Sequence, residues 1–174
     1  MVQGDRGAAD EGVDGCVARG CHARRQLLGV YDPKLLEPMA RVLANLGSVR
    51  CLIVHGDDGI DEITTTTTSR VCELHDGEIR TYRIDPAEFG ILPPRLGELR
   101  VGSAAESAAV MRSVFAGRRG SHRDIVVLNA AAALLAGGQV QTLHAGIRRA
   151  AELLDAGAVA RTLDRLIAAT NEKA

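Results

Sequence analysis

The segment from residue 26 to residue 55 constrains the fold more than any other part of the chain. Residues 26–31 and 50–55 are short, mostly apolar runs, which is typical of strands buried on both faces of a parallel sheet. The residues between them follow a helical pattern. A strand, a helix and a second strand in this order predict one βαβ unit, which is nearly always right-handed.

The helix between these strands has clear start and stop signals. Asp32 is a suitable N-cap, and Pro33 suits the first helical position. Apolar residues then recur on one helical face until Gly47, which ends the pattern. We expect Pro38 to kink or restart the helix early.

The middle of the chain predicts two further strands, at residues 63–74 and 77–84. The five threonines at 64–68 favour extended backbone because they are β-branched. The turn His75-Asp76-Gly77 carries the Asp-Gly signature of a hairpin. The expected result is a sheet with parallel strands near 26–31 and 50–55 and a hairpin near 63–84.

The rest of the chain is predicted to be mostly helical. Residues 85–88 form a helix-start signal and 90–102 a loop, and helices are expected from the Ser103 capping box to near Gly117, at 121–136, from Thr142 to before Gly157, and at about 158–170. The predicted fold class is therefore α/β, a partly parallel sheet with flanking helices, in one domain over residues 25–174. Residues 1–24 are rich in glycine and lack apolar periodicity, so a divergent, disordered tail is expected there.

Composition excludes several classes of partner. The net charge of −1 and the aromatic content of 2% give no reason to expect nucleic acid, and no apolar run is long enough to span a membrane. A cytoplasmic protein is the default expectation. Cys51 and Cys72 lie in predicted strands as free thiols. Cys16, Cys21 and His22 are close together, but no second ligand pair is evident for zinc.

Four carboxylates follow the second strand within six residues: Asp57, Asp58, Asp61 and Glu62. Ligand sites in parallel sheets lie beyond the carboxyl ends of the strands. The adjacent pair Asp61 and Glu62 suits Mg²⁺, which takes one or two carboxylates and completes its shell with water and phosphates. In an extended segment the two side chains would diverge, so a shared metal requires an irregular backbone, which the neighbouring glycines permit.

Other polar residues near this loop have two interpretations each. His55 suits a general base or, more often, a hydrogen-bonded structural histidine. The threonines at 64–68 could offer hydroxyls to a phosphate or simply form a strand. Asn129 is a single polar residue in an alanine-rich helix, suited to bridging a neighbouring loop. In each case the structural interpretation is favoured.

Several segments, in the same order, resemble the later part of the anthranilate phosphoribosyltransferase family. They are residues 25–40 (RQLLGVYDPKLLEPMA), 54–56 (VHG), 59–63 (GIDEI), 69–71 (SRV), 76–79 (DGEI), 124–134 (DIVVLNAAAAL) and 169–171 (ATN). The resemblance covers about residues 25–171. It implies the C-terminal α/β domain of the anthranilate phosphoribosyltransferase and nucleoside phosphorylase-like fold.

The resemblance also implies an activity. The family transfers the phosphoribosyl group of PRPP to anthranilate in tryptophan biosynthesis, giving N-(5-phosphoribosyl)anthranilate and pyrophosphate, and requires Mg²⁺. By this resemblance, Asp61 and Glu62 correspond to the acidic pair that holds magnesium on the pyrophosphate of PRPP. Family members usually form homodimers through a small helical domain that is not recognisable here, which leaves a homodimer doubtful.

The sequence also departs from the family pattern. It contains neither the family's Gly-Thr-Gly-Gly-Asp loop for PRPP nor its anthranilate-contacting arginine segment, and Thr67-Thr68-Ser69 stands where the family has Gly-Pro-Thr. We therefore expect the C-terminal portion of such a transferase, inactive on its own. The alternatives are a non-catalytic binding or regulatory remnant, or a pyrimidine nucleoside phosphorylase-like enzyme. The family match at residues 29–33 counts against the second.

Overall fold

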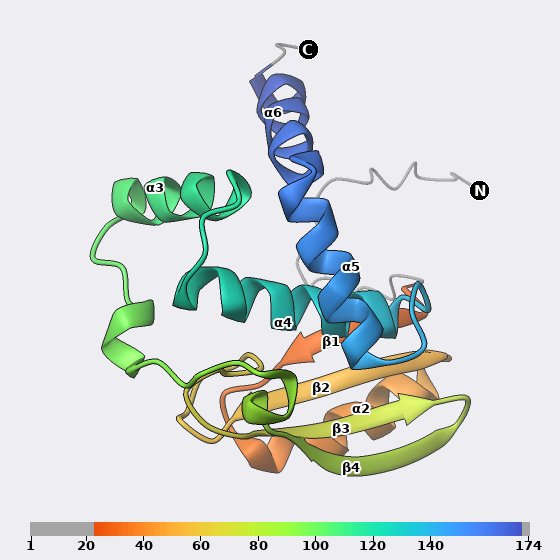
Figure 1. The fold of residues 1–174 in the computed structure, drawn as a ribbon. Coiled ribbons are helices and arrows are strands. Elements are labelled where there is room, and N and C mark those ends of the chain that lie inside the picture. Colours follow the sequence, from red (N-terminus) through yellow and green to blue (C-terminus); the bar gives the residue numbers. More distant parts are fainter. Residues whose placement is uncertain (1–22, 172–174) are drawn as a thin grey trace, which may run out of the picture.

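The computed structural model describes residues 23–171 as a four-stranded sheet with helices on both faces (Figure 1). Helix α2 (Leu36–Asn45) covers one face, and α4 (Ser121–Ala136) covers the other. Most of the expected tail, residues 1–22, lies outside the described residues, as do Cys16, Cys21 and His22.

The sheet has the order β1-β2-β3-β4. Strand β1 (Arg25–Gly29) runs parallel to β2 (Arg50–Gly56), with Leu27 opposite Leu52. Strands β3 (Ser69–His75) and β4 (Glu78–Ile84) continue the sheet in antiparallel fashion. One parallel pair with flanking helices confirms the predicted fold class.

The connection from β1 to β2 begins with the predicted cap. The Asp32 side chain accepts a hydrogen bond from the Lys34 amide at 2.9 Å, which opens the 3₁₀ turn η1 (Pro33–Leu35). Helix α2 then starts at Leu36, so Pro38 falls in its first turn, where a missing amide hydrogen costs little. Of the two outcomes expected for Pro38, a kink or an early restart, the structure has the restart.

Strand β3 is shorter than predicted, because it begins at Ser69 and not at residue 63. The threonine segment 64–68 is a loop. Its extended propensity is overridden by hydrogen bonds from its hydroxyl groups to a neighbouring carboxylate, described below. The hairpin itself is confirmed, with Asp76 and Gly77 at φ 49° and 87° as a type I′ turn requires.

The helix-start signal at residues 85–88 leads only to a 3₁₀ turn, η2 (Pro86–Phe89), and the predicted loop contains another, η3 (Leu96–Leu99). The later helices agree with prediction: α3 (Ala104–Phe115), α4, α5 (Leu143–Asp155) and α6 (Ala158–Asn171). Ser103 and Thr142 cap α3 and α5 through side-chain hydrogen bonds of 3.1 Å. Within residues 23–171, every helix is too short or too polar to cross a membrane.

Strand β2 is buried along its whole length and contributes to the cores on both faces of the sheet. Cys51 and Ile53 pack toward α2, whereas Leu52 and Val54 pack toward α4. Cys51 is a buried free thiol, as is Cys72 on β3. Because β2 is held on both faces, its carboxyl end delivers the following loop to a fixed place beside α4.

Candidate functional site

The loop from residue 57 to residue 68 joins β2 to β3 and folds back on its own start. The Gly56 amide donates to the Ile60 carbonyl at 2.9 Å, and the Gly59 amide donates to the Gly56 carbonyl at 2.8 Å. Gly59 has φ 94°, a conformation that glycine adopts readily. This turn provides the irregular backbone that Asp61 and Glu62 need in order to lie together.

Asp58 organises the inside of the loop. Its carboxylate accepts hydrogen bonds from the hydroxyls of Thr64 at 2.6 Å and Thr66 at 2.5 Å, and the Ile60 amide lies 3.4 Å away. Burial raises the pKa of Asp58, but these bonds outweigh it and hold the pKa below its ordinary value. Two threonine hydroxyls are therefore committed to the loop itself, which supports their structural interpretation.

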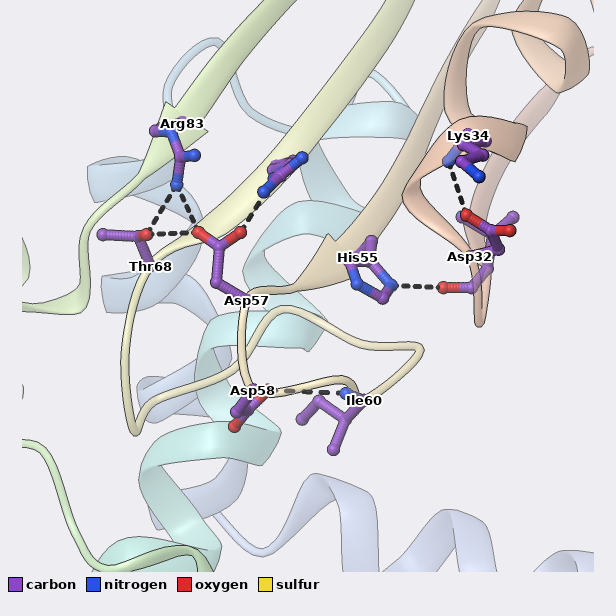
Figure 2. Close-up of polar contacts among 10 residues, drawn as sticks. Asp32, Lys34, His55, Asp57, Asp58, Ile60, Thr68 and Arg83 are labelled. Carbon is purple, nitrogen blue, oxygen red and sulfur yellow. Dashed lines mark hydrogen bonds and ion pairs between the residues drawn. The ribbon is translucent and has the colours of Figure 1, made fainter.

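Asp57 fastens the same loop to the sheet (Figure 2). It accepts from the Thr68 hydroxyl at 2.5 Å and from Arg70 on β3 at 2.8 Å, and it also pairs with Arg83 on β4. The bond from Thr68 is the largest influence on the pKa of Asp57 and lowers it; burial acts in the opposite direction, and Arg70 and Arg83 lower the pKa further. Asp57 is therefore a structural anion.

Asp61 and Glu62 differ from these two carboxylates. Within residues 23–171, no hydrogen bond or ion pair to either carboxylate is found, and both residues are exposed. They line a cavity of about 670 Å³, which we call the acidic groove. Its other walls come from η3 and the following residues, from α3 and from α4, and include Leu99, Arg100, Val110, Met111, His122 and Val126.

The electrostatics of the pair favour a cation. Glu62 is exposed as a whole residue, but the surrounding groove partly desolvates its carboxyl group and so raises its pKa, and the negative charge of Asp61 raises it further. Asp61 is therefore close enough to act on Glu62, and neither carboxylate has an ion-pair partner among the described residues, so a cation bound here would be attracted by both.

Two contacts support the backbone on either side of Glu62. Gly29, at the end of β1, lies so close to Asp61 that a β-carbon at residue 29 would come within 1.6 Å of the Asp61 carbonyl oxygen. Asn129 on α4 bonds to the backbone of Ile63, which is fully buried. The residues on both sides of Glu62 are therefore fixed.

His55 is a buried, hydrogen-bonded histidine, as the structural interpretation predicts. Its Nδ1 lies 2.8 Å from the Val30 carbonyl oxygen, and the residue is only 7% exposed (Figure 2). Val30 in turn donates its amide hydrogen to Val54 at 3.0 Å. These two bonds extend the pairing with β2 to Val30, one residue past the end of β1.

Some site residues were missed by the sequence argument although signals existed. A glycine inside a strand often marks a close approach of backbone, and Gly29 is one. An aspartate followed by threonines favours side-chain to backbone and hydroxyl contacts over a strand, and Asp58 makes them. By contrast, no local pattern indicates that Arg70 and Arg83 meet at Asp57.

The donor set fits Mg²⁺. Among the described residues, no three His, Cys, Asp or Glu side chains cluster to form a complete metal site. A pair of carboxylates beside an open groove matches the usual binding of Mg²⁺, which retains several waters and completes its shell with substrate phosphates. A dedicated protein cage is not required.

Comparison with known proteins places this site in a family context. Residues 13–160 match the profile of the glycosyl transferase family, a/b domain. The chain is 47% identical over 149 residues to anthranilate phosphoribosyltransferase of Rhizobium johnstonii, covering 86% of this chain and 44% of that protein. It is 52% identical over 132 residues to the Clostridium kluyveri enzyme of that name, covering 76% and 39%.

Solved structures similar to this chain include enzymes of the same name. The anthranilate phosphoribosyltransferase of Thermus thermophilus superposes with a TM-score of 0.76 at 35% identity, over 86% of this chain and 43% of that one. The Saccharomyces cerevisiae enzyme in complex with PRPP and Mg has a TM-score of 0.73 at 24% identity, over 80% and 41%, and shows the same fold. The chain spans less than half the length of the curated relatives it matches.

Proposed function

The chain belongs to the glycosyl transferase family, and from that premise we propose that it carries the metal-binding part of an anthranilate phosphoribosyltransferase. The reaction is transfer of the phosphoribosyl group from PRPP to the amine of anthranilate, with release of pyrophosphate. In this proposal Asp61 and Glu62 hold Mg²⁺ against the pyrophosphate of PRPP. The substrates are small molecules, the setting is cytoplasmic tryptophan biosynthesis, and other polypeptide is needed for turnover.

One observation carries the proposal. The described loop commits Asp57 and Asp58 to internal bonds and leaves only Asp61 and Glu62 of its four carboxylates facing an open groove. The same segment lies within the region matched by the family profile. The name of the yeast complex states that PRPP and Mg are bound to that relative, which supports a magnesium-dependent phosphate ligand here.

The chain's own residues contribute in two ways. Asp61 and Glu62 provide anionic oxygens, and Glu62 must be deprotonated to do so despite its raised pKa. The apolar side chains of the groove, such as Met111 and Val126, lower the local dielectric and so strengthen attraction between the pair and a cation. Magnesium, when bound, neutralises charge that builds up on the departing pyrophosphate.

Binding of PRPP to the purified chain tests this assignment. We expect titration calorimetry to detect PRPP binding in the presence of Mg²⁺ and not in the presence of EDTA. Asp61→Asn and Glu62→Gln should each weaken the magnesium-dependent binding by about tenfold or more, because perturbing a metal site usually costs about 10–100-fold in affinity.

Asp164→Asn is the matched control, because Asp164 is an exposed carboxylate on α6, outside the acidic groove. It should bind PRPP as the parent chain does. Equal binding by the parent and by Asp61→Asn, or binding that is insensitive to EDTA, would contradict the assignment of the metal to this pair.

A further inference from the structure

Asn129 connects helix α4 to the loop that carries the acidic pair. Its side-chain oxygen accepts a hydrogen bond from the Ile63 amide at 3.0 Å, and its side-chain nitrogen donates to the Ile63 carbonyl at 2.8 Å. The amide group thus binds both polar groups of one residue, as a partner strand would. Asparagine suits this task because its side chain offers a donor and an acceptor together.

A third bond fixes the direction of the asparagine side chain. The same nitrogen also donates to the Ile125 carbonyl, one turn earlier in α4, at 3.0 Å. Helix α4 is in turn packed against the sheet through Leu128 and Ala132, which belong to the same core as Ile63. The Asn129 amide is therefore a rigid point on a rigid element.

The position of Ile63 gives this contact its importance. Ile63 directly follows Glu62, and its side chain is fully buried beside Leu128. Asp61 and Glu62 are adjacent carboxylates of like charge, and no hydrogen bond or ion pair among the described residues holds either side chain in place. The backbone must supply that restraint, through Gly29 on one side and Asn129 on the other.

We propose that Asn129 is a positioning residue for the metal pair, acting through the Ile63 backbone to hold Glu62 beside Asp61 in a geometry ready for a divalent cation. This inference rests on the proposed function of the acidic pair. Asn129 does not touch the metal in this scheme. Removing its amide leaves the loop intact around Asp58 but frees the segment that carries Glu62.

Mn²⁺, detected by the EPR signal of the free ion, is the probe, because it needs no substrate and no turnover. Asn129→Ala should weaken Mn²⁺ binding by about tenfold, within the range found when residues that orient metal ligands are removed. Hydrogen exchange at the Ile63 amide should accelerate in Asn129→Ala. Asn129→Asp places a carboxylate oxygen, which cannot donate, against the carbonyl oxygens of Ile63 and Ile125, so exchange at Ile63 should accelerate at least as much as in Asn129→Ala.

Val127→Ala is the matched control, since Val127 is a buried residue of α4 that belongs to a different core cluster from Ile63. It should lower the stability of the fold and leave Mn²⁺ affinity and Ile63 exchange under native conditions unchanged.

The possible outcomes distinguish failure of the metal assignment from failure of the positioning role. If the parent chain binds no Mn²⁺ and Asn129→Ala still accelerates exchange at Ile63, the metal assignment fails while the clamp stands as a structural feature. If the parent binds Mn²⁺ and Asn129→Ala binds it equally well, the positioning role is refuted and the metal assignment is not.

Discussion

Individual carboxylates on one short loop have opposite electrostatic environments. Hydrogen bonds hold the pKa values of Asp57 and Asp58 below their ordinary values, with two arginines contributing at Asp57, whereas burial and Asp61 raise the pKa of Glu62. The first two stabilise the fold as anions. Glu62 as an anion opposes the fold, which is the pattern expected where a charged group is retained for a ligand and not for stability.

Replacing Glu62 by glutamine should therefore stabilise the chain at neutral pH. A carboxyl group whose pKa is raised by folding lowers stability as the pH rises through its unfolded value, about 4.3 for glutamate, and the full cost is present above the folded pKa. Glu62→Gln should be more stable than the parent at pH 7, and the difference should shrink toward pH 4. Urea unfolding at both pH values measures this.

The control for that experiment is Glu88→Gln. Glu88 is an exposed glutamate on η2, outside the acidic groove, and its replacement should change stability equally little at both pH values. Addition of Mg²⁺ should stabilise the parent more than Glu62→Gln, because a ligand that binds only the folded state raises its stability. A glutamine variant less stable than the parent at pH 7 would show that the Glu62 charge supports the fold.

Among the elements, α4 and α5 approach each other closely at Gly146. A β-carbon at this position would lie 2.8 Å from the Ala131 carbonyl oxygen and 3.0 Å from the Ala131 β-carbon. The two helices can therefore pack at this distance only because residue 146 has no side chain. The close packing of α4 also bears on the site, since α4 carries Asn129.

Gly146→Ala should destabilise the chain although alanine is the better helix former. Alanine gains up to about 1 kcal/mol over glycine inside a helix, but overpacking a tight contact costs about 1–3 kcal/mol. We expect a net loss of about 1 kcal/mol in the free energy of unfolding, measured by urea denaturation.

Gly97→Ala provides the comparison for Gly146→Ala. No atom lies within 4 Å of the β-carbon that this change adds, and Gly97 does not have a positive φ. It should be neutral or slightly stabilising. Equal stability of the two alanine variants would mean that α4 and α5 can separate without cost.

At the level of elements, most of the fold followed from sequence. The apolar runs, the Asp32 and Ser103 caps and the Asp76-Gly77 turn act over a few residues, and the structure confirms the strands, helices and hairpin that they predicted. The prediction of a strand at the threonine segment was wrong. The preference of β-branched residues for strands is weak, and hydrogen bonds from the threonine hydroxyls to Asp58 overrode it. The partners of Asn129 and Asp57 depend on tertiary contacts, which no local pattern encodes.

For the whole molecule, the described residues place the acidic pair Asp61 and Glu62 beside a groove, but the sequence contains no glycine-rich phosphate loop of the family type. We expect the purified 174-residue chain to show no appreciable turnover with PRPP, anthranilate and Mg²⁺. Correct positioning of two reactants supplies about 7–11 kcal/mol of a typical barrier, and a metal anchor alone does not provide it. Loss of anthranilate fluorescence measures the rate.

The Thermus thermophilus enzyme, assayed under the same conditions, is the positive control for turnover. A rate of about 1 per second or faster from the purified chain, which is ordinary for enzymes, would contradict the prediction. It would show that residues elsewhere in the chain bind the phosphates and orient the acceptor. Binding of PRPP without turnover is the combination expected from the metal pair alone.

Because Gly29 lies against the Asp61 carbonyl, which substitutions are tolerated at residue 29 depends on the position of the loop that carries Asp61. Residue 29 carries no functional group, so chemistry alone would not mark it as constrained during evolution. Its missing side chain nevertheless defines the space that the acidic loop occupies. A larger residue at position 29 becomes tolerable once that loop has moved. In relatives that no longer need the acidic pair, a larger residue in place of this glycine would indicate that the loop has moved.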